Sequence, residues 1–162
     1  VEPHSMPGRR FLALSIACLA ALVGAGTAQA VIVLQSSISG IKLGMTRPEV
    51  RAKVEPSSVV HGTNEFGPYT VFRYFRLRVT FQGNEGATAV STTRSRQETP
   101  AGIHVLSTES ALRAAYPGAR CKTELGAFRH CWIGRFQAGR RVTDFRISTG
   151  VVRSILVGFV ID

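Results

Sequence analysis

The spacing of hydrophobic and polar residues divides the chain beyond residue 30 into β-like and helix-like stretches. Residues 69–82 (YTVFRYFRLRVTFQ) are rich in aromatic and β-branched residues, and apolar positions alternate with polar ones from Phe75 onward. We therefore expect one strand here, with a buried face and a basic, solvated face. Residues 87–93 are predicted to form its return strand, and the nearly continuous apolar run 151–161 a central strand.

Two short helices are predicted from their capping residues. Thr46 and Glu49 fit a capping box, in which each side chain bonds the other residue's backbone amide, and Pro56 ends the helix. Thr108 or Ser107 is predicted to cap the start of the second helix. Both helices are short with a narrow apolar stripe, so a sheet must bury them.

Part of the sequence occurs twice. Residues 40–56 and 102–118 align without a gap, and each stretch precedes segments that alternate as antiparallel strands do. The pattern predicts an α+β fold of two tandem helix-plus-antiparallel-strand repeats, 31–98 and 99–162. We expect the repeats to share one sheet within a single compact domain, with the helices packed on one face.

The first copy carries a motif known from other proteins. Ile41–Val50 (IKLGMTRPEV) resembles the I-x-x-G-M-T-x-x-E/Q-V signature of the SmpA/OmlA-type outer-membrane-assembly lipoproteins and of the β-lactamase-inhibitor-protein-like family. The latter resemblance implies tandem helix-then-sheet repeats and an aromatic-rich concave sheet that grips a target. The second copy departs from the motif, because Leu106 and Ser107 replace Gly-Met. No individual contact residue can be transferred from either family.

The first thirty residues read as an export signal. Arg9 and Arg10 precede the apolar run 11–23, and Ala28-Gln29-Ala30 fits a signal-peptidase site. We predict cleavage after Ala30 and a secreted, periplasmic or cell-envelope location, with no transmembrane segment afterwards. An uncleaved anchor and lipidation at Cys18 are the alternatives, and the Leu usually found three residues before a lipidated cysteine is missing.

Two cysteines remain beyond residue 30. Cys121 and Cys131 form an even pair, which in an exported protein indicates a disulfide. Leu125-Gly126 makes a plausible turn between them, so the pair is expected on a hairpin. The alternative is a metal or redox site, but C-x-x-C is absent and His130 alternates to the other face of the strand. We predict no metal and no cofactor.

The positive charge narrows the range of partners. Removing residues 1–30 takes away Arg9, Arg10 and Glu2, so the formal net charge falls from +10 to +9. Such a chain favours anionic envelope polymers, lipid head groups, nucleic acid or an acidic protein. Export makes nucleic acid an improbable physiological partner. GC-rich coding sequence, which raises Arg, Ala and Gly together, would explain the charge without a function.

Catalytic signatures are missing from the sequence. His61, His104 and His130 lie far apart, and none has metal-ligand spacing. Asp occurs only at Asp144 and Asp162, and no close pair of carboxylates suggests acid–base catalysis. We therefore predict that the protein is not an enzyme, with a small hydrolase of unrecognised site as the third hypothesis.

The basic, aromatic strand is the candidate interaction surface. Arginine and aromatic side chains dominate the binding energy of many interfaces. The residues predicted to bind are Tyr69, Phe72, Tyr74, Arg76, Arg78, Trp132 and Phe136. The simpler interpretation makes the aromatics core and the arginines a solvated face. The leading hypothesis is an exported, monomeric, non-enzymatic module that binds or inhibits a protein, and the alternative is a protein held electrostatically on anionic envelope polymer.

Overall fold

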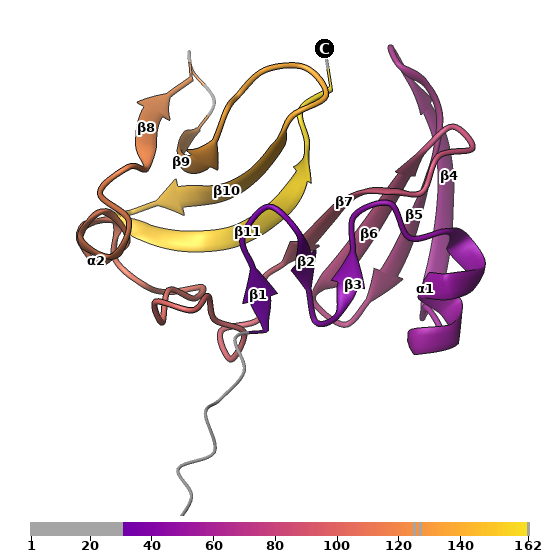
Figure 1. The fold of residues 1–162 in the computed structure, drawn as a ribbon, viewed down its shortest axis with the longest axis horizontal. Coiled ribbons are helices and arrows are strands. Elements are labelled where there is room, and N and C mark those ends of the chain that lie inside the picture. The colour runs from indigo at the N-terminus through magenta and orange to yellow at the C-terminus, as the bar shows by residue number, and fades with distance from the viewer. Residues whose placement is uncertain (1–30, 125, 127, 162) are drawn as a thin grey trace, which may run out of the picture.

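An eight-stranded antiparallel sheet dominates the structure. The computed structural model describes residues 31–124, 126 and 128–161. In chain order the strands are β4 (Ser58–Asn64), β5 (Gly67–Tyr74), β6 (Leu77–Gln82), β7 (Ala87–Thr92), β8 (Arg120–Thr123), β9 (Arg129–Gly134), β10 (Arg141–Ser148) and β11 (Val151–Phe159). Their order across the sheet is β4-β5-β6-β7-β11-β10-β9-β8. Two consecutive meanders are therefore joined through their last strands, β7 and β11 (Figure 1).

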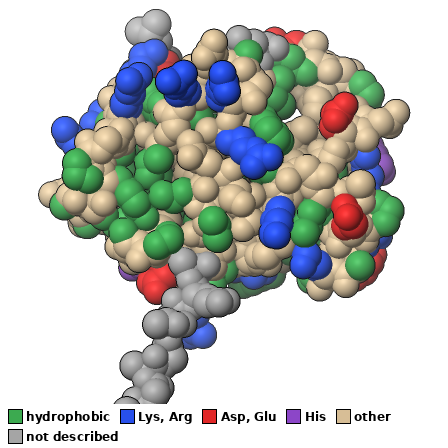
Figure 2. Space-filling view, in the orientation of Figure 1, with side chains coloured by type: hydrophobic (Ala, Val, Ile, Leu, Met, Phe, Trp, Pro, Cys, Tyr) green, Lys and Arg blue, Asp and Glu red, His purple; other side chains and the backbone are tan. Residues whose placement is uncertain are grey.

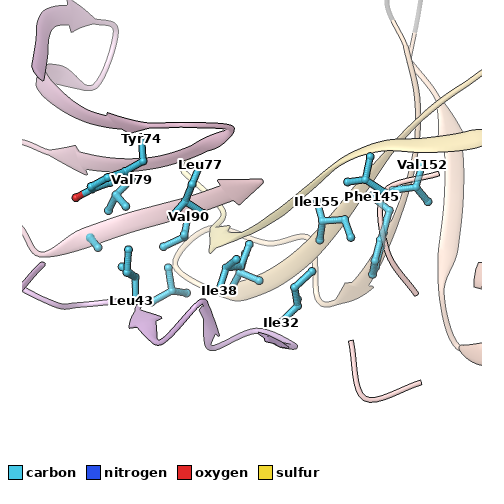
Figure 3. Packing of buried hydrophobic residues seen from close by; sticks show 14 of the residues in the cluster. Ile32, Ile38, Leu43, Tyr74, Leu77, Val79, Val90, Phe145, Val152 and Ile155 are labelled. Carbon is cyan, nitrogen blue, oxygen red and sulfur yellow. The ribbon is translucent and has the colours of Figure 1, made fainter. Parts of the chain in front are cut away.

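A small sheet covers one face of this large sheet. Its three strands have two residues each: β1 (Ile32–Val33), β2 (Ser37–Ile38) and β3 (Ile41–Lys42). Ile32 and Ile38 are fully buried and face Val90 and Ile155 of the large sheet (Figure 3). This layer of branched aliphatic side chains is continuous with buried Phe72, Phe81 and Phe145 in one hydrophobic core, whose burial is the main stabilising contribution.

The first helix, α1 (Arg47–Lys53), begins as predicted. The Thr46 hydroxyl accepts a hydrogen bond from the Glu49 amide at 3.4 Å, and the Glu49 carboxylate accepts one from the Thr46 amide at 2.8 Å. Two backbone donors at the helix start are thereby satisfied. Val50 is the one buried residue of this helix, which agrees with a stripe too narrow for independent stability.

The second helix, α2 (Glu109–Ala115), is capped by Thr108, whose hydroxyl accepts from the Ala111 amide at 3.1 Å. Its buried residue is Leu112, the counterpart of Val50 in the sequence match. The two matched segments thus share local structure, namely a turn followed by one short capped helix. This similarity ends with the helix and does not define the architecture.

The predicted α+β class is wrong. Strands account for 49% and helices for 11% of the structure, and the two sheets of three and eight strands leave only two helices among the described residues. The chain is therefore mostly β and is not built from helix-plus-strand repeats. The physical reason lies in the covering layer. We expected helices to bury the sheet, whereas β1–β3 supply three fully buried or nearly fully buried isoleucines and each helix supplies one residue.

The predicted single strand over 69–82 is two strands. β5 ends at Tyr74 and β6 begins at Leu77, with a two-residue turn at Phe75 and Arg76. Arg76 adopts a left-handed φ of +56°, a conformation that arginine rarely takes. Because the turn residues lack Gly, Asn and Pro, the sequence carries no turn signal at this point.

Three other predictions about strands hold. β7 is the return strand of β6, and β11 lies centrally, between β7 and β10. Cys121 and Cys131 are directly opposite each other on the β8–β9 hairpin and form the predicted disulfide. Gly126 lies in the connecting turn, whereas Leu125 is outside the described residues.

The export signal predicted for residues 1–30 lies outside the described residues. Within the described part of the chain, no helix is both long and apolar enough to cross a membrane. The division at residue 98 and the monomeric state remain predictions.

Candidate functional site

The two faces of the eight-stranded sheet differ in what covers them. Val50 of α1 and Leu112 of α2 belong to the same buried cluster as the small sheet, so both helices lie on the covered face. We call the opposite face the open face. Successive residues of a strand point to opposite sides, and one registered row of the open face contains Arg73, Arg78, Ser91, Leu156, Asp144, Trp132 and Arg120.

The β5–β7 half of the open face holds a basic hollow of about 530 Å³. Its lining includes Arg73, Arg76, Arg78 and Arg146. Among the residues that the structure describes, no carboxylate lines this hollow and none forms an ion pair with these four arginines. Guanidinium groups gathered without ion-paired carboxylates create a positive potential that attracts anions.

Next to the basic hollow lies a second one, the aromatic pocket, of about 440 Å³. Its apolar lining comes mainly from Phe128, Phe136, Val142, Leu156, Phe159, Val160 and Ile161. The two hollows share Arg146, Ser154 and Leu156, so they are contiguous across β10 and β11. A volume of this size falls within the range of about 300–1,000 Å³ that is common for small-molecule sites.

A buried histidine–aspartate pair lines the aromatic pocket. His130 Nδ1 lies 2.5 Å from Asp144 Oδ2, and the side chain of His130 is only 5% exposed. The imidazole is enclosed by Phe128, Trp132 and Phe136, with ring centroids 5.3, 5.0 and 5.9 Å away. The pair is thus a polar element set inside an aromatic cluster on the open face.

The environment of this pair sets its electrostatics. Burial raises the pKa of Asp144 above the ordinary value of an aspartate, and the hydrogen bond from His130 and the charge of Arg146 oppose that rise. The second ring nitrogen, Nε2, lies 3.4 Å from Glu124 Oε1 but has no hydrogen bond to any described residue. Trp132 Nε1 is likewise buried without a described partner.

The pocket contains the residue types of a hydrolytic triad in a different arrangement. His130, Asp144 and Ser154 all line it. However, Ser154 lies on β11 and His130 on β9, with β10 between them, a backbone separation of about 10 Å at ordinary strand spacing. No hydrogen bond joins the serine to the histidine, although an activated nucleophile lies within hydrogen-bonding reach of its base.

Four of the predicted binding residues belong to the open face. Arg76 and Arg78 line the basic hollow, and Phe136 lines the aromatic pocket and is 55% exposed. Trp132 lies in the registered row next to Asp144 and packs against Phe136 at 5.4 Å between ring centroids. The structure therefore places residues from both meanders on one surface.

The three aromatic residues predicted on β5 do not present their rings to the two hollows in the same way, although Tyr74 belongs to the lining of the basic hollow. Phe72 and Tyr74 lie on the covered face, where Phe72 packs edge-on against Phe81 with centroids 4.8 Å apart. Tyr69 is on the open face, but its ring lies over Gly62 of β4, outside both hollows. Phe72 and Tyr74 are buried, as the simpler interpretation of the aromatics expects, and whether Tyr74 contributes to binding stays a prediction.

Sequence reasoning missed Arg73, His130, Asp144 and Arg146 as site residues. A usable signal was present in the β9–β10 hairpin. Pairing of Gly134 with Val142 places His130 opposite Arg146 and diagonal to Asp144, and diagonal neighbours on a sheet can interact. The hairpin register, which the alternation of 128–148 suggests only weakly, decides whether these side chains meet.

A second cluster of chemically active groups lies on the covered face. One ligand atom each of Glu109, Cys121 and Cys131 lies within 4.8 Å of the others. Both sulfurs are committed to the disulfide, and a metal requires the thiolate form. The carboxylate of Glu109 is instead bound by Arg129, at 2.7 and 2.5 Å.

The open face is thus defined by this chain's own geometry: a basic hollow, an adjoining aromatic pocket, and a buried His130–Asp144 pair between aromatic rings. Its side chains come from both meanders, which meet through the β7–β11 pairing. No family model, curated protein or solved structure matches the chain.

Proposed function

We propose that this protein is an exported, non-enzymatic binding module that holds an acidic protein partner on the open face of its large sheet. The observation that carries the proposal is the pairing of Arg73 with Arg78. These residues are directly opposite each other on β5 and β6. Like charges in such positions destabilise a sheet, so an anion from outside is the natural counter-charge.

The rest of the basic hollow supports this interpretation. Arg76 and Arg146 add two further guanidinium groups without ion pairs among the described residues. Guanidinium binds carboxylates in a bidentate manner and is weakly hydrated, which makes it the cation of choice at protein interfaces. The adjacent aromatic pocket supplies the apolar surface that gives an interface its core.

The disulfide supports an exported location. Disulfides persist in the periplasm and outside the cell and are rare in the reducing cytosol. Together with the signal predicted for residues 1–30, the Cys121–Cys131 bond is consistent with a periplasmic or secreted protein.

The test is affinity capture from cell envelope and culture fluid with residues 31–162 as bait. A bait carrying Arg73→Glu and Arg78→Glu is expected to lose the partner. The matched control is Arg96→Glu with Arg153→Glu, which changes the net charge equally at exposed positions outside both hollows. If both double variants capture the same proteins as the unchanged bait, the open face is not the binding surface.

A second candidate function is retention on anionic envelope polymer. Arg135, Arg140 and Arg141 line a third hollow, which shares Phe159 with the aromatic pocket. Figure 2 shows Lys and Arg side chains spread over the visible surface, with a group along its upper edge. Charge of this kind acts without a specific partner. It predicts that the protein leaves the envelope at high salt, because exposed charges are then screened, and that both double variants weaken retention equally.

A further inference from the structure

The basic hollow and the aromatic pocket meet at a boundary where an arginine-rich lining gives way to a mainly apolar one. Arg146 lines both, and its guanidinium carbon lies 4.0 Å from the centroid of the Phe128 ring. On one side the positive charge continues to Arg78 and Arg73, and on the other most of the lining residues are apolar. A ligand that occupied both hollows would meet cations at one end and hydrocarbon at the other.

The aromatic pocket has features of a site rather than a shallow depression. A hydrogen-bonded pair, His130 and Asp144, lies in its wall, and the His130 side chain is more than nine-tenths buried. The other ring nitrogen of His130, Nε2, is also buried, and among the described residues it has only Glu124 Oε1 nearby, at 3.4 Å. The wall of the pocket therefore combines a few placed polar groups with a mainly apolar lining, as small-molecule sites do.

We propose that the aromatic pocket and the basic hollow together bind one amphipathic anion, with its apolar body in the pocket and its carboxylate or phosphate head group on Arg146. This inference rests on the proposed function for its choice of the open face and deepens it by adding a small-molecule ligand. Filling the pocket removes water from Arg146, and a desolvated guanidinium requires an anion as its neighbour.

Other ligand classes fit the lining less well. A cation would meet four arginines and only one carboxylate, Asp144, which His130 already engages. A neutral hydrocarbon would fill the pocket but leave Arg146 desolvated and unpaired. A small inorganic anion would leave the apolar lining exposed to water. A ligand with one anionic end and one apolar end matches both the basic hollow and the aromatic pocket.

The proposal is tested by titration calorimetry of residues 31–162 with dodecanoate and with dodecyl phosphate, each below its micelle-forming concentration. Both are expected to bind with a negative heat-capacity change, the mark of buried apolar surface. Dodecyltrimethylammonium has the apolar chain but a positive charge, and acetate has the negative charge but no chain. Neither is expected to bind. Binding of the cationic amphiphile as tightly as dodecanoate would overturn the proposal.

Two variants separate the head-group and body contacts. Arg146→Gln is expected to weaken dodecanoate binding about tenfold through loss of a charge-assisted hydrogen bond. Phe136→Ala removes a ring that is 55% exposed and so leaves folding intact, and it should weaken binding about threefold or more. The controls are Arg96→Gln and Phe75→Ala, whose side chains are exposed and outside the pocket. Equal affinity in all four variants would show that the ligand binds elsewhere.

The head group identifies the source of the ligand. Tighter binding of dodecanoate indicates a free fatty acid, and tighter binding of dodecyl phosphate indicates a lipid phosphate, which co-sedimentation with phosphatidylglycerol vesicles then checks. The outcome is independent of the capture experiment. Loss of partner capture in the Arg73→Glu and Arg78→Glu bait without any amphiphile binding would refute the amphipathic-anion site and leave the proposed function standing.

Discussion

Burying His130 and Asp144 has a desolvation cost for both side chains. A carboxylate and an imidazole are held among aromatic rings, where charged groups lose hydration. Their mutual hydrogen bond compensates for part of that loss, and the raised pKa of Asp144 shows that burial outweighs the attraction. Removing either residue would therefore leave the other as a buried polar group without its hydrogen-bond partner, which destabilises the fold.

We predict that the two residues show strong energetic coupling. Asp144→Val or His130→Phe alone leaves the other partner unpaired and should lower the free energy of unfolding by about 1–3 kcal/mol. The double variant should recover most of this loss, since an apolar pair suits the aromatic surroundings. Urea unfolding of the four proteins measures the coupling. His61→Phe, at an exposed position of β4, is the control and should change stability little. Additive losses would contradict the prediction.

A second prediction at this scale concerns Arg73. Because it is directly opposite Arg78, Arg73→Glu replaces a repulsive cross-strand pair with an attractive one. Thermal unfolding should show an increase in stability, by about 0.5 kcal/mol, while partner capture weakens. Arg96→Glu, in an exposed loop, should change neither stability nor capture. A fall in stability on Arg73→Glu would mean that the native arginine pair is not repulsive.

Among the elements, β8 is the strand most dependent on a single bond. It is four residues long, lies at the edge of the sheet, and pairs only with β9. The disulfide between Cys121 and Cys131 fixes that pairing, and α2 is tied to β9 by Glu109 and Arg129. Covalent and ionic links thus hold the end of the sheet that adjoins the aromatic pocket.

We predict that removing the disulfide destabilises the protein by about 2–3 kcal/mol, as expected for a short closed loop. Cys121→Ala with Cys131→Ala is the variant, and urea unfolding is the measurement. Reduction of the unchanged protein should give the same loss and add the mass of two hydrogen atoms. The double variant, as control, should not respond to the reductant. An unchanged mass on reduction would reject the disulfide.

The ion pair of Glu109 with Arg129 predicts a specific dependence of stability on pH. The hydrogen bonds from Arg129 lower the pKa of Glu109 below its ordinary value of 4.5. The contribution of the pair is therefore complete above pH 4.5 and is lost as pH falls through the lower pKa of the folded state. Unfolding free energies of the protein and of Glu109→Gln should differ at pH 7 and converge in acid. A difference that persists in acid would assign the effect to packing.

Local signals allowed the sequence to predict some elements and not others. The capping box at Thr46 and the apolar run of β11 are each encoded by one short continuous stretch of sequence, so each can be predicted without knowledge of the rest of the fold. The turn at Phe75 and Arg76 has no turn residues, and the two-residue strands β1–β3 are too short for any alternation to show. These short strands replaced the helices as the cover of the sheet, which is why the predicted fold class failed.

The candidate site was predictable only in part for the same reason. Arg78 and Arg76 are marked by a local pattern of alternating charge. The contact between His130 and Asp144 depends on the β9–β10 register, and the meeting of Arg78 with Arg146 depends on the β7–β11 pairing between distant segments. Those pairings are set by the burial of a shared core, which no short stretch of sequence reveals.

At the scale of the whole molecule, the two meanders are held together by one strand pair and one core. β7 and β11 form four registered residue pairs, among them Val90 with Val157, both fully buried. The buried cluster continues through the small sheet, α1 and α2 without a break between the meanders. The open face spans this junction, so binding across both hollows requires that the meanders stay in register.

We therefore predict that the two meanders unfold together and that protection from hydrogen exchange falls from the centre of the sheet to its edges. Amides of β7 and β11 should exchange most slowly, at the free energy of global unfolding. β4, an edge strand without a buried residue, should exchange fastest. β8, at the other edge, should be slower than β4 while its disulfide is intact and should match β4 after reduction. If one meander exchanged at a much lower free energy than the other, the sheet would be two units, and the open face would not be a single rigid surface.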